Sequence, residues 1–93
     1  MSFYNVIIVN NTSTLINSLT IKNNLTISSG RLAPVANTLN IAGNWTNYGT
    51  AGFTEAASTV NFNGVGTQIL ISTGGENFTN LSINNSGLSL IHI

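Results

Sequence analysis

Few side chains in this 93-residue chain have the chemistry of a catalytic acid or base. The carboxylates are Glu55 and Glu76, the basic residues are Lys22 and Arg31, and the histidine is His92. Hydrolysis of a glycosidic bond needs two carboxylates about 5–9 Å apart. The two glutamates lie in predicted loops, with no evident apolar pocket or basic partner to adapt them to catalysis. We therefore interpret both as solvated loop residues and expect no enzyme activity and no catalytic residues, His92 included.

Metal, phosphate and membrane chemistry also lack the residues they need. One histidine without cysteine cannot form a transition-metal site, and two carboxylates do not provide the oxygen ligands that calcium requires. The glycine-rich segments 63–66 and 73–75 precede neither a helix nor Gly-Lys-Ser/Thr, so they are interpreted as corners between strands. Charged residues make up 4% of the chain, which gives no attraction to nucleic acid or anionic lipid. We expect no cofactor, no metal, no nucleic acid and no membrane insertion.

Aromatic and amide side chains offer a different chemistry, the recognition of carbohydrate. Tyr48 stands beside Gly49 and is the better candidate for an exposed ring. Trp45 occupies the position that Leu25 holds one repeat earlier, so packing in the core is favoured over sugar stacking. A row of outward polar side chains could bind hydroxyl groups, or could only cross-link neighbouring strands through hydrogen bonds. The candidate ligand-binding residues are Tyr48, Trp45 and this row: Thr20, Asn40, Asn61 and Ser82.

Short β-strands must position these side chains. The chain has 16 asparagines, 12 threonines and 10 serines, and it shows no apolar stripe with a helical period. Alternating apolar and polar residues between Asn and Gly corners predict strands instead. We expect strands at residues 6–9, 14–16, 19–21, 25–27, 31–33, 38–41, 44–46, 52–54, 59–62, 68–71, 80–83 and 88–92.

The expected strands recur at a nearly constant spacing. An apolar–polar–apolar motif followed by Asn or Gly returns at intervals of about 20 residues, which is typical of a repeat architecture. Parallel coils would stack the matching residues in two inner columns: Leu19, Leu39, Val60 and Leu81 in the first, and Ile21, Ile41, Phe62 and Ile83 in the second. On another face we expect a pair and a group: Leu25 with Trp45, and Ile27 with Ile69 and Ile71.

This spacing favours an all-β parallel β-helix (β-solenoid) of about four coils of 20–21 residues, with three short strands per coil. An antiparallel sandwich is the competing fold, but hairpins require no constant spacing. A longer repeat relates residues 3–8 to residues 78–83, and neither end shows a helical or charged cap. We therefore expect residues 1–93 to be one segment of a longer array, with 88–93 as either a further strand or a non-native tail.

Three stretches carry a resemblance to known repeats. They are LTISSG at 25–30, the segment 37–68 that contains GNWTNYG and TVNFNG, and NFTNLSINNSG at 77–87. They resemble the Asn/Thr/Gly-rich tandem repeats of very large secreted or surface proteins of bacteria, such as Bacteroidota. The chain resembles a fragment of such a protein taken from a metagenome. The resemblance covers most of residues 3–87 and implies a right-handed parallel β-helix with a structural or adhesive role. It supplies no catalytic residues, and the apolar segment 31–34 departs from the pattern.

Together these features predict a structural and adhesive stalk segment of a bacterial protein that is secreted or held at the cell surface. Its expected partners are neighbouring repeats of the same chain or other copies stacked end to end, and surface glycans. The alternative is a carbohydrate-binding module that uses Tyr48, Trp45 and the polar row.

Overall fold

Short strands make up the regular structure of the protein. The computed structural model describes residues 1–49, 52–87 and 90–92, and every regular element in them is a β-strand. In chain order the strands are β1 (Ser2–Phe3), β2 (Val6–Ile8), β3 (Thr12–Thr14), β4 (Leu19–Ile21), β5 (Leu25–Ile27), β6 (Arg31–Ala33), β7 (Thr38–Ile41), β8 (Trp45–Asn47), β9 (Thr59–Phe62), β10 (Gln68–Ser72), β11 (Asn80–Ile83) and β12 (Leu90–His92).

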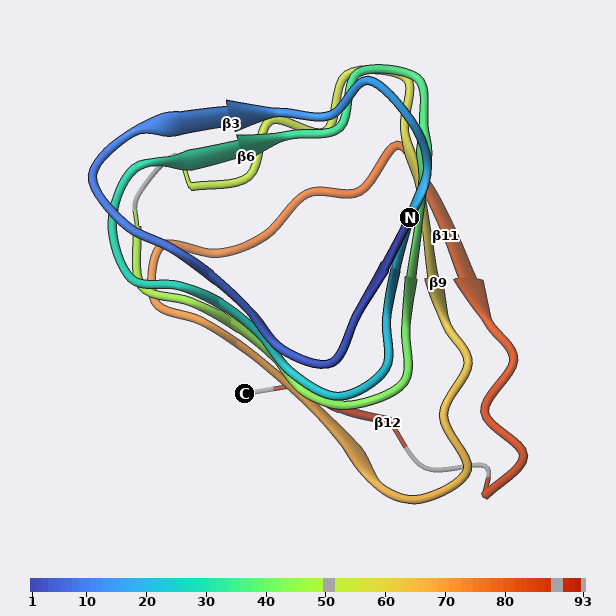
Figure 1. Cartoon of the computed structure of the whole chain (residues 1–93). Coiled ribbons are helices and arrows are strands. Elements are labelled where there is room, and N and C mark those ends of the chain that lie inside the picture. Colours follow the sequence, from blue (N-terminus) through green and yellow to red (C-terminus); the bar gives the residue numbers. More distant parts are fainter. Residues whose placement is uncertain (50–51, 88–89, 93) are drawn as a thin grey trace.

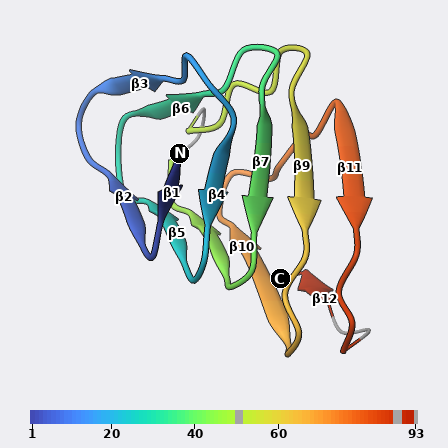
Figure 2. The ribbon, with the colours of Figure 1, turned by 45° about the vertical axis from the view of Figure 1, so that its right-hand side comes forward.

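These strands form three parallel sheets around a triangular core (Figure 1). The first sheet has the order β1-β4-β7-β9-β11, the second β12-β10-β8-β5-β2, and the third β3-β6. Because the chain visits the sheets in turn, it winds as a parallel β-solenoid of about four turns. Figure 2 shows the strands of the first sheet side by side along the stack. The parallel pairing excludes the antiparallel sandwich.

Both predicted inner columns are confirmed by the register of the first sheet. Leu19, Leu39, Val60 and Leu81 align in one column, and Ile21, Ile41, Phe62 and Ile83 align in the other. The members from β4, β7 and β9 are at most 3% exposed, whereas Leu81 and Ile83 on the edge strand β11 are 48% and 52% exposed. Full burial of such side chains stabilises the fold by roughly 1.5–3 kcal/mol each.

The second sheet confirms one predicted pair and corrects one predicted group. Leu25 aligns with Trp45, as expected, and Trp45 aligns with Leu70. The group that does not form is Ile27, Ile69 and Ile71. Leu70 is buried, so its two neighbours in β10 lie on the opposite face and are only half-buried. The chain takes 25 residues from Trp45 to Leu70, against 20 from Leu25 to Trp45, so the residue of β10 that aligns with Trp45 is Leu70 and not Ile69 or Ile71.

Some strand boundaries also differ from those expected. Strand β1 was not predicted, β3 covers 12–14 rather than 14–16, and β8 covers 45–47 rather than 44–46. The expected strand at 52–54 is reduced to a single bridge between Phe53 and Leu32, so the third sheet has no regular strand after β6 among the described residues. The longer repeat aligns β2 with β11, which belong to different sheets, and it is therefore not a structural repeat.

The segment 88–93 lies partly within the described structure. Residues 90–92 form β12, which pairs with β10. Residues 88, 89 and 93 of the expected tail or strand lie outside the described residues. The right-handed winding stays a prediction.

An asparagine ladder stabilises the corner between the first and second sheets. Asn5 Oδ1 accepts a hydrogen bond from the backbone N–H of Asn24 at 3.1 Å. Asn24 Oδ1 accepts from the N–H of Asn44, and Asn44 Oδ1 from that of Ile69, both at 2.9 Å. Each side chain thus satisfies a corner N–H in the next turn. Gly43 belongs to the same corner because a Cβ there would collide with a backbone oxygen of the preceding turn.

Gln68 closes the wider corner at residues 63–67 with a complete set of hydrogen bonds. Its side chain is 1% exposed. Nε2 donates to the carbonyl oxygens of Ile41 and Gly43 at 2.9 and 2.8 Å. Oε1 accepts from the N–H of Gly64 at 2.8 Å and from Asn85 Nδ2 at 2.9 Å. A buried amide is tolerated here because its donors and its acceptor are all paired.

We predict that Ile41→Ala lowers the free energy of unfolding by about 2–5 kcal/mol, since Ile41 is fully buried in the second inner column. Ile16→Ala is the matched control, because Ile16 is 89% exposed and its replacement should change stability by less than about 0.5 kcal/mol. Urea titration measures both. A loss below about 1 kcal/mol for Ile41→Ala would contradict the inward placement of this column.

Candidate functional site

Trp45 is the centre of an aromatic cluster inside the solenoid. The ring is fully buried. Its centroid lies 4.8 Å from that of Phe53 at 86° and 5.4 Å from that of Phe78 at 72°, both edge-to-face arrangements. Phe62 packs against the same cluster, 6.1 Å from Trp45. The prediction that Trp45 packs in the core is confirmed, and its ring has no exposed face on which a sugar could stack.

The prediction that Glu76 is a solvated loop residue is wrong. Its Oε2 accepts a hydrogen bond from the indole Nε1–H of Trp45 at 2.9 Å and another from Asn47 Nδ2 at 3.0 Å. The residue is half-buried. Glu76 is therefore not a freely solvated loop residue, because its carboxylate is oriented by two donors from β8. This interaction joins the fourth turn to the buried tryptophan of the third.

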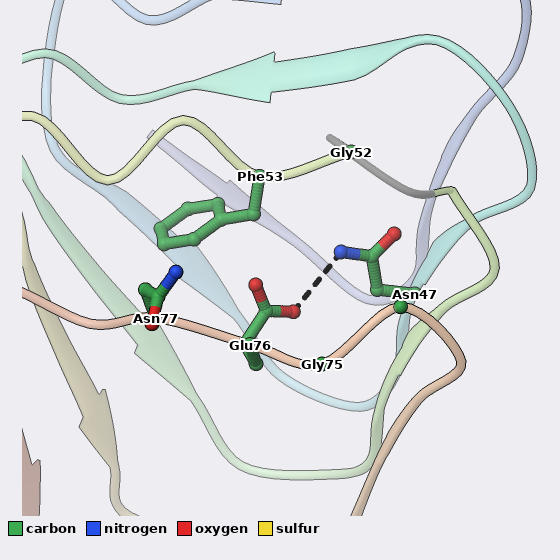
Figure 3. A pocket seen from close by; sticks show the side chains of 7 residues that line it. Asn47, Gly52, Phe53, Gly75, Glu76 and Asn77 are labelled. Atoms are coloured by element: carbon green, nitrogen blue, oxygen red, sulfur yellow. Dashed lines mark hydrogen bonds between the residues drawn. The ribbon is translucent and has the colours of Figure 1, made fainter.

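A pocket of about 270 Å³ opens beside this carboxylate (Figure 3). It lies where the loop after β10 passes the end of β8 and the irregular segment around Phe53. The lining residues are Asn47, Gly52, Phe53, Gly74, Gly75, Glu76 and Asn77. We call this the Glu76 pocket. It lies on the side of the third sheet, where no regular strand follows β6 among the described residues.

The polar groups of the Glu76 pocket form an acceptor-rich site. Two donors already occupy Glu76 Oε2, while Oε1 accepts no hydrogen bond from the described part of the chain. None of the described residues that line the pocket is basic, so none of them can form an ion pair with the carboxylate. Glu76 is the one carboxylate among the described residues that line the pocket, and Glu55 is not among them. The arrangement suits binding of a polar ligand.

Binding of a metal ion requires several ligand side chains grouped around one point. Among the described residues, no group of three or more His, Asp or Glu side chains is placed to hold a metal ion. Within residues 1–49, 52–87 and 90–92, no helix is long and apolar enough to cross a membrane.

The predicted polar row lies on the outer side of the first sheet, and its members align in register: Thr20, Asn40, Asn61 and Ser82. Asn61 Nδ2 donates to Asn40 Oδ1 at 3.0 Å. Asn84 Nδ2 donates to Asn61 Oδ1 at 2.8 Å and to Ser82 Oγ at 2.9 Å. The bonds from Asn61 to Asn40 and from Asn84 to Asn61 are the expected cross-links between turns, while the bond to Ser82 lies within one turn. A ligand-binding role for the row stays a prediction.

The six predicted ligand-binding residues do not form one site. The polar row belongs to the first sheet, whereas Trp45 and Tyr48 lie in and just after β8 of the second. Tyr48 is 57% exposed, in agreement with its predicted position, while Trp45 is buried. Sequence reasoning missed Asn47, Phe53 and Glu76 as neighbours. The available signal was the wider spacing between β8 and β10, which indicates an irregular turn.

Comparison with protein-family models, curated proteins and solved structures found no match to this chain.

We predict that Glu76→Ala lowers the free energy of unfolding by about 1–3 kcal/mol, because Trp45 Nε1–H and Asn47 Nδ2–H lose their acceptor. Glu76→Gln should cost less, since its carbonyl oxygen can still accept both bonds. Urea titration followed by the fluorescence of the single tryptophan measures these changes. Glu55→Ala removes the other carboxylate as a control. Equal stability of the Glu76→Ala and Glu55→Ala variants would contradict the structural role of Glu76.

Proposed function

We propose that this chain is a structural and adhesive stalk segment of a bacterial protein that is secreted or held at the cell surface. Regular stacking of turns supports the structural part, because each added turn extends the solenoid by one strand spacing of about 4.8 Å. The resemblance to tandem repeats of bacterial surface proteins supports the location. The polar, nearly uncharged surface supports an adhesive role through many weak contacts.

The observation that carries the proposal is the exposure of inner-column side chains at both ends of the first sheet. Leu81 and Ile83 align with buried residues of β9, yet they are 48% and 52% exposed. At the other end, Phe3 aligns with buried Ile21 and is 49% exposed. Within the described part of the chain, edge strands β1 and β11 also present backbone groups without a strand partner. Both ends are thus suited to stack against a further turn.

A further turn can be supplied in two ways. One is a neighbouring repeat of the same polypeptide. The other is a second copy, with β11 of one molecule beside β1 of the next in the same parallel sense. Such a head-to-tail contact joins different surfaces of identical molecules and therefore generates open filaments rather than closed dimers.

We predict that the 93-residue chain self-associates with increasing concentration, because stacking buries the exposed column residues of both ends. Sedimentation velocity measures the association. Leu81→Lys combined with Ile83→Lys should abolish it by placing two charges on the edge of β11. The control is Ile16→Lys combined with Val65→Lys, at sites 89% and 81% exposed outside the inner columns, which should still associate. A wild-type chain that sediments as a clean monomer at high concentration would contradict the proposal.

A carbohydrate-binding module is the second candidate function, and the exposed ring of Tyr48 favours it. We predict that a glycan array shows binding by the wild-type chain and that Tyr48→Ala removes most of it, since an aromatic face can stack on a sugar ring. Tyr4→Ala is the control because Tyr4 is 66% exposed and lies in the first turn. Absence of binding above background, or equal loss in both variants, would argue against this function.

A further inference from the structure

The Glu76 pocket places a hydrogen-bond acceptor and a donor within one small space. The acceptor is Glu76 Oε1, which receives no hydrogen bond from the described residues, while Oε2 is held by Trp45 and Asn47. The donor is the side-chain amide of Asn77, an exposed residue whose nitrogen points toward the side of the pocket that holds Phe53 and Glu76 (Figure 3). A hydroxyl group is the complementary ligand, because it donates and accepts at once.

Other ligand classes match this pocket less well. An anion would face the Glu76 carboxylate with no basic residue among those that line the pocket. An ammonium ion could pair with Oε1 but has only donors, so it would leave the N–H of the exposed Asn77 amide bonded only to water. A calcium ion needs about six to eight oxygen ligands, and the lining residues include a single carboxylate.

The size and the walls of the pocket also limit the ligand. Its volume of about 270 Å³ corresponds to roughly nine water molecules, enough for one small polar ring. Phe53 is only 6% exposed, so it presents little of its ring to the pocket. Recognition must therefore come mainly from hydrogen bonds. Tyr48, next to Asn47, is anchored to the same loop, because its carbonyl accepts from Thr73 Oγ1 at 3.0 Å.

The presence of a carboxylate at this position, where a neutral acceptor would satisfy the protein's own donors, favours a role in ligand binding. Trp45 Nε1–H and Asn47 Nδ2–H would be satisfied by any neutral acceptor. The chain has only two carboxylate side chains in 93 residues, and one of them is half-buried here. Its Oε1 accepts no hydrogen bond from the described residues. A carboxylate oxygen is a stronger acceptor for a ligand hydroxyl than an amide or a hydroxyl oxygen.

We propose that the Glu76 pocket binds one sugar unit of a glycan, with a ring hydroxyl donating to Glu76 Oε1 and accepting from the Asn77 amide. The site is separate from the exposed ring of Tyr48 alone and from the polar row. It does not depend on end-to-end stacking, since neither β1 nor β11 contributes to it. If the pocket binds no glycan, the stalk proposal is unaffected. If the chain does not stack end to end, the pocket proposal is unaffected.

The test uses the indole N–H of Trp45, which is the single tryptophan and donates to the same carboxylate. Methyl glycosides of glucose, galactose, mannose and N-acetylglucosamine are titrated into ¹⁵N-labelled protein, and the indole resonance is followed. We expect at least one glycoside to shift it saturably with a dissociation constant in the millimolar range, as befits a ligand of about a dozen heavy atoms.

Matched variants locate the binding. Glu76→Gln keeps an acceptor for Trp45 and Asn47 but can turn an N–H₂ group toward the ligand, so we expect it to weaken binding by at least about tenfold. Asn77→Ala should weaken binding as well. Glu55→Gln makes the same change in net charge outside the pocket and should bind as the wild type does.

Three outcomes would overturn the proposal. The first is the absence of a saturable shift with every glycoside. The second is a shift that survives unchanged in the Glu76→Gln variant. The third is saturation by ethylammonium chloride, calcium chloride or glycerol at concentrations equal to or lower than those of the best glycoside, which would assign the pocket to a cation or to any small polyol.

Discussion

In-register stacking of successive turns is the constraint on which the rest of this structure depends. Its strands have two to five residues, too few to be stable alone, so each finds its partner about 20 residues away in the next turn. The register then decides the surroundings of every residue. Leu39 must be apolar because Leu19 and Val60 lie directly beside it, and Asn44 must offer an acceptor because the N–H of Ile69 is aimed at it.

The same constraint explains where the regular pattern ends. The extra residues between β8 and β10 shift the residue that aligns with Trp45 to Leu70, so Gln68 and Leu70 are buried and Ile69 is only half-buried. Gln68 is tolerated because its hydrogen bonds close the wider corner. The longer turn also lacks a strand on the third face among the described residues, and the Glu76 pocket occupies that gap. The candidate site therefore lies where the repeat is irregular.

The sequence allowed the periodic part of the fold to be predicted and not the part that breaks the period. The columns through Leu39 and Ile41 follow from alternation and a spacing of about 20 residues, so neighbours in space are readable as neighbours in the repeat. The exposure of Tyr48 and the burial of Trp45 follow from the same alternation. Glu76 could not be placed in this way, because its partners Trp45 and Asn47 lie 31 and 29 residues earlier, at no multiple of the repeat.

Stacking also accounts for the scarcity of charge and for the position of Glu76. A charged residue inside a repeated row would have its equivalents about 4.8 Å away, and two like charges at that distance repel by about 1 kcal/mol even in bulk water. Asn and Thr can stand in such rows because their side chains bond to one another, as Asn61 does to Asn40. The charges of this chain accordingly lie beside neutral residues, such as Arg31 next to Thr12, or in loops. A carboxylate is accommodated in the irregular fourth turn, outside the repeated rows, where Glu76 meets the buried indole.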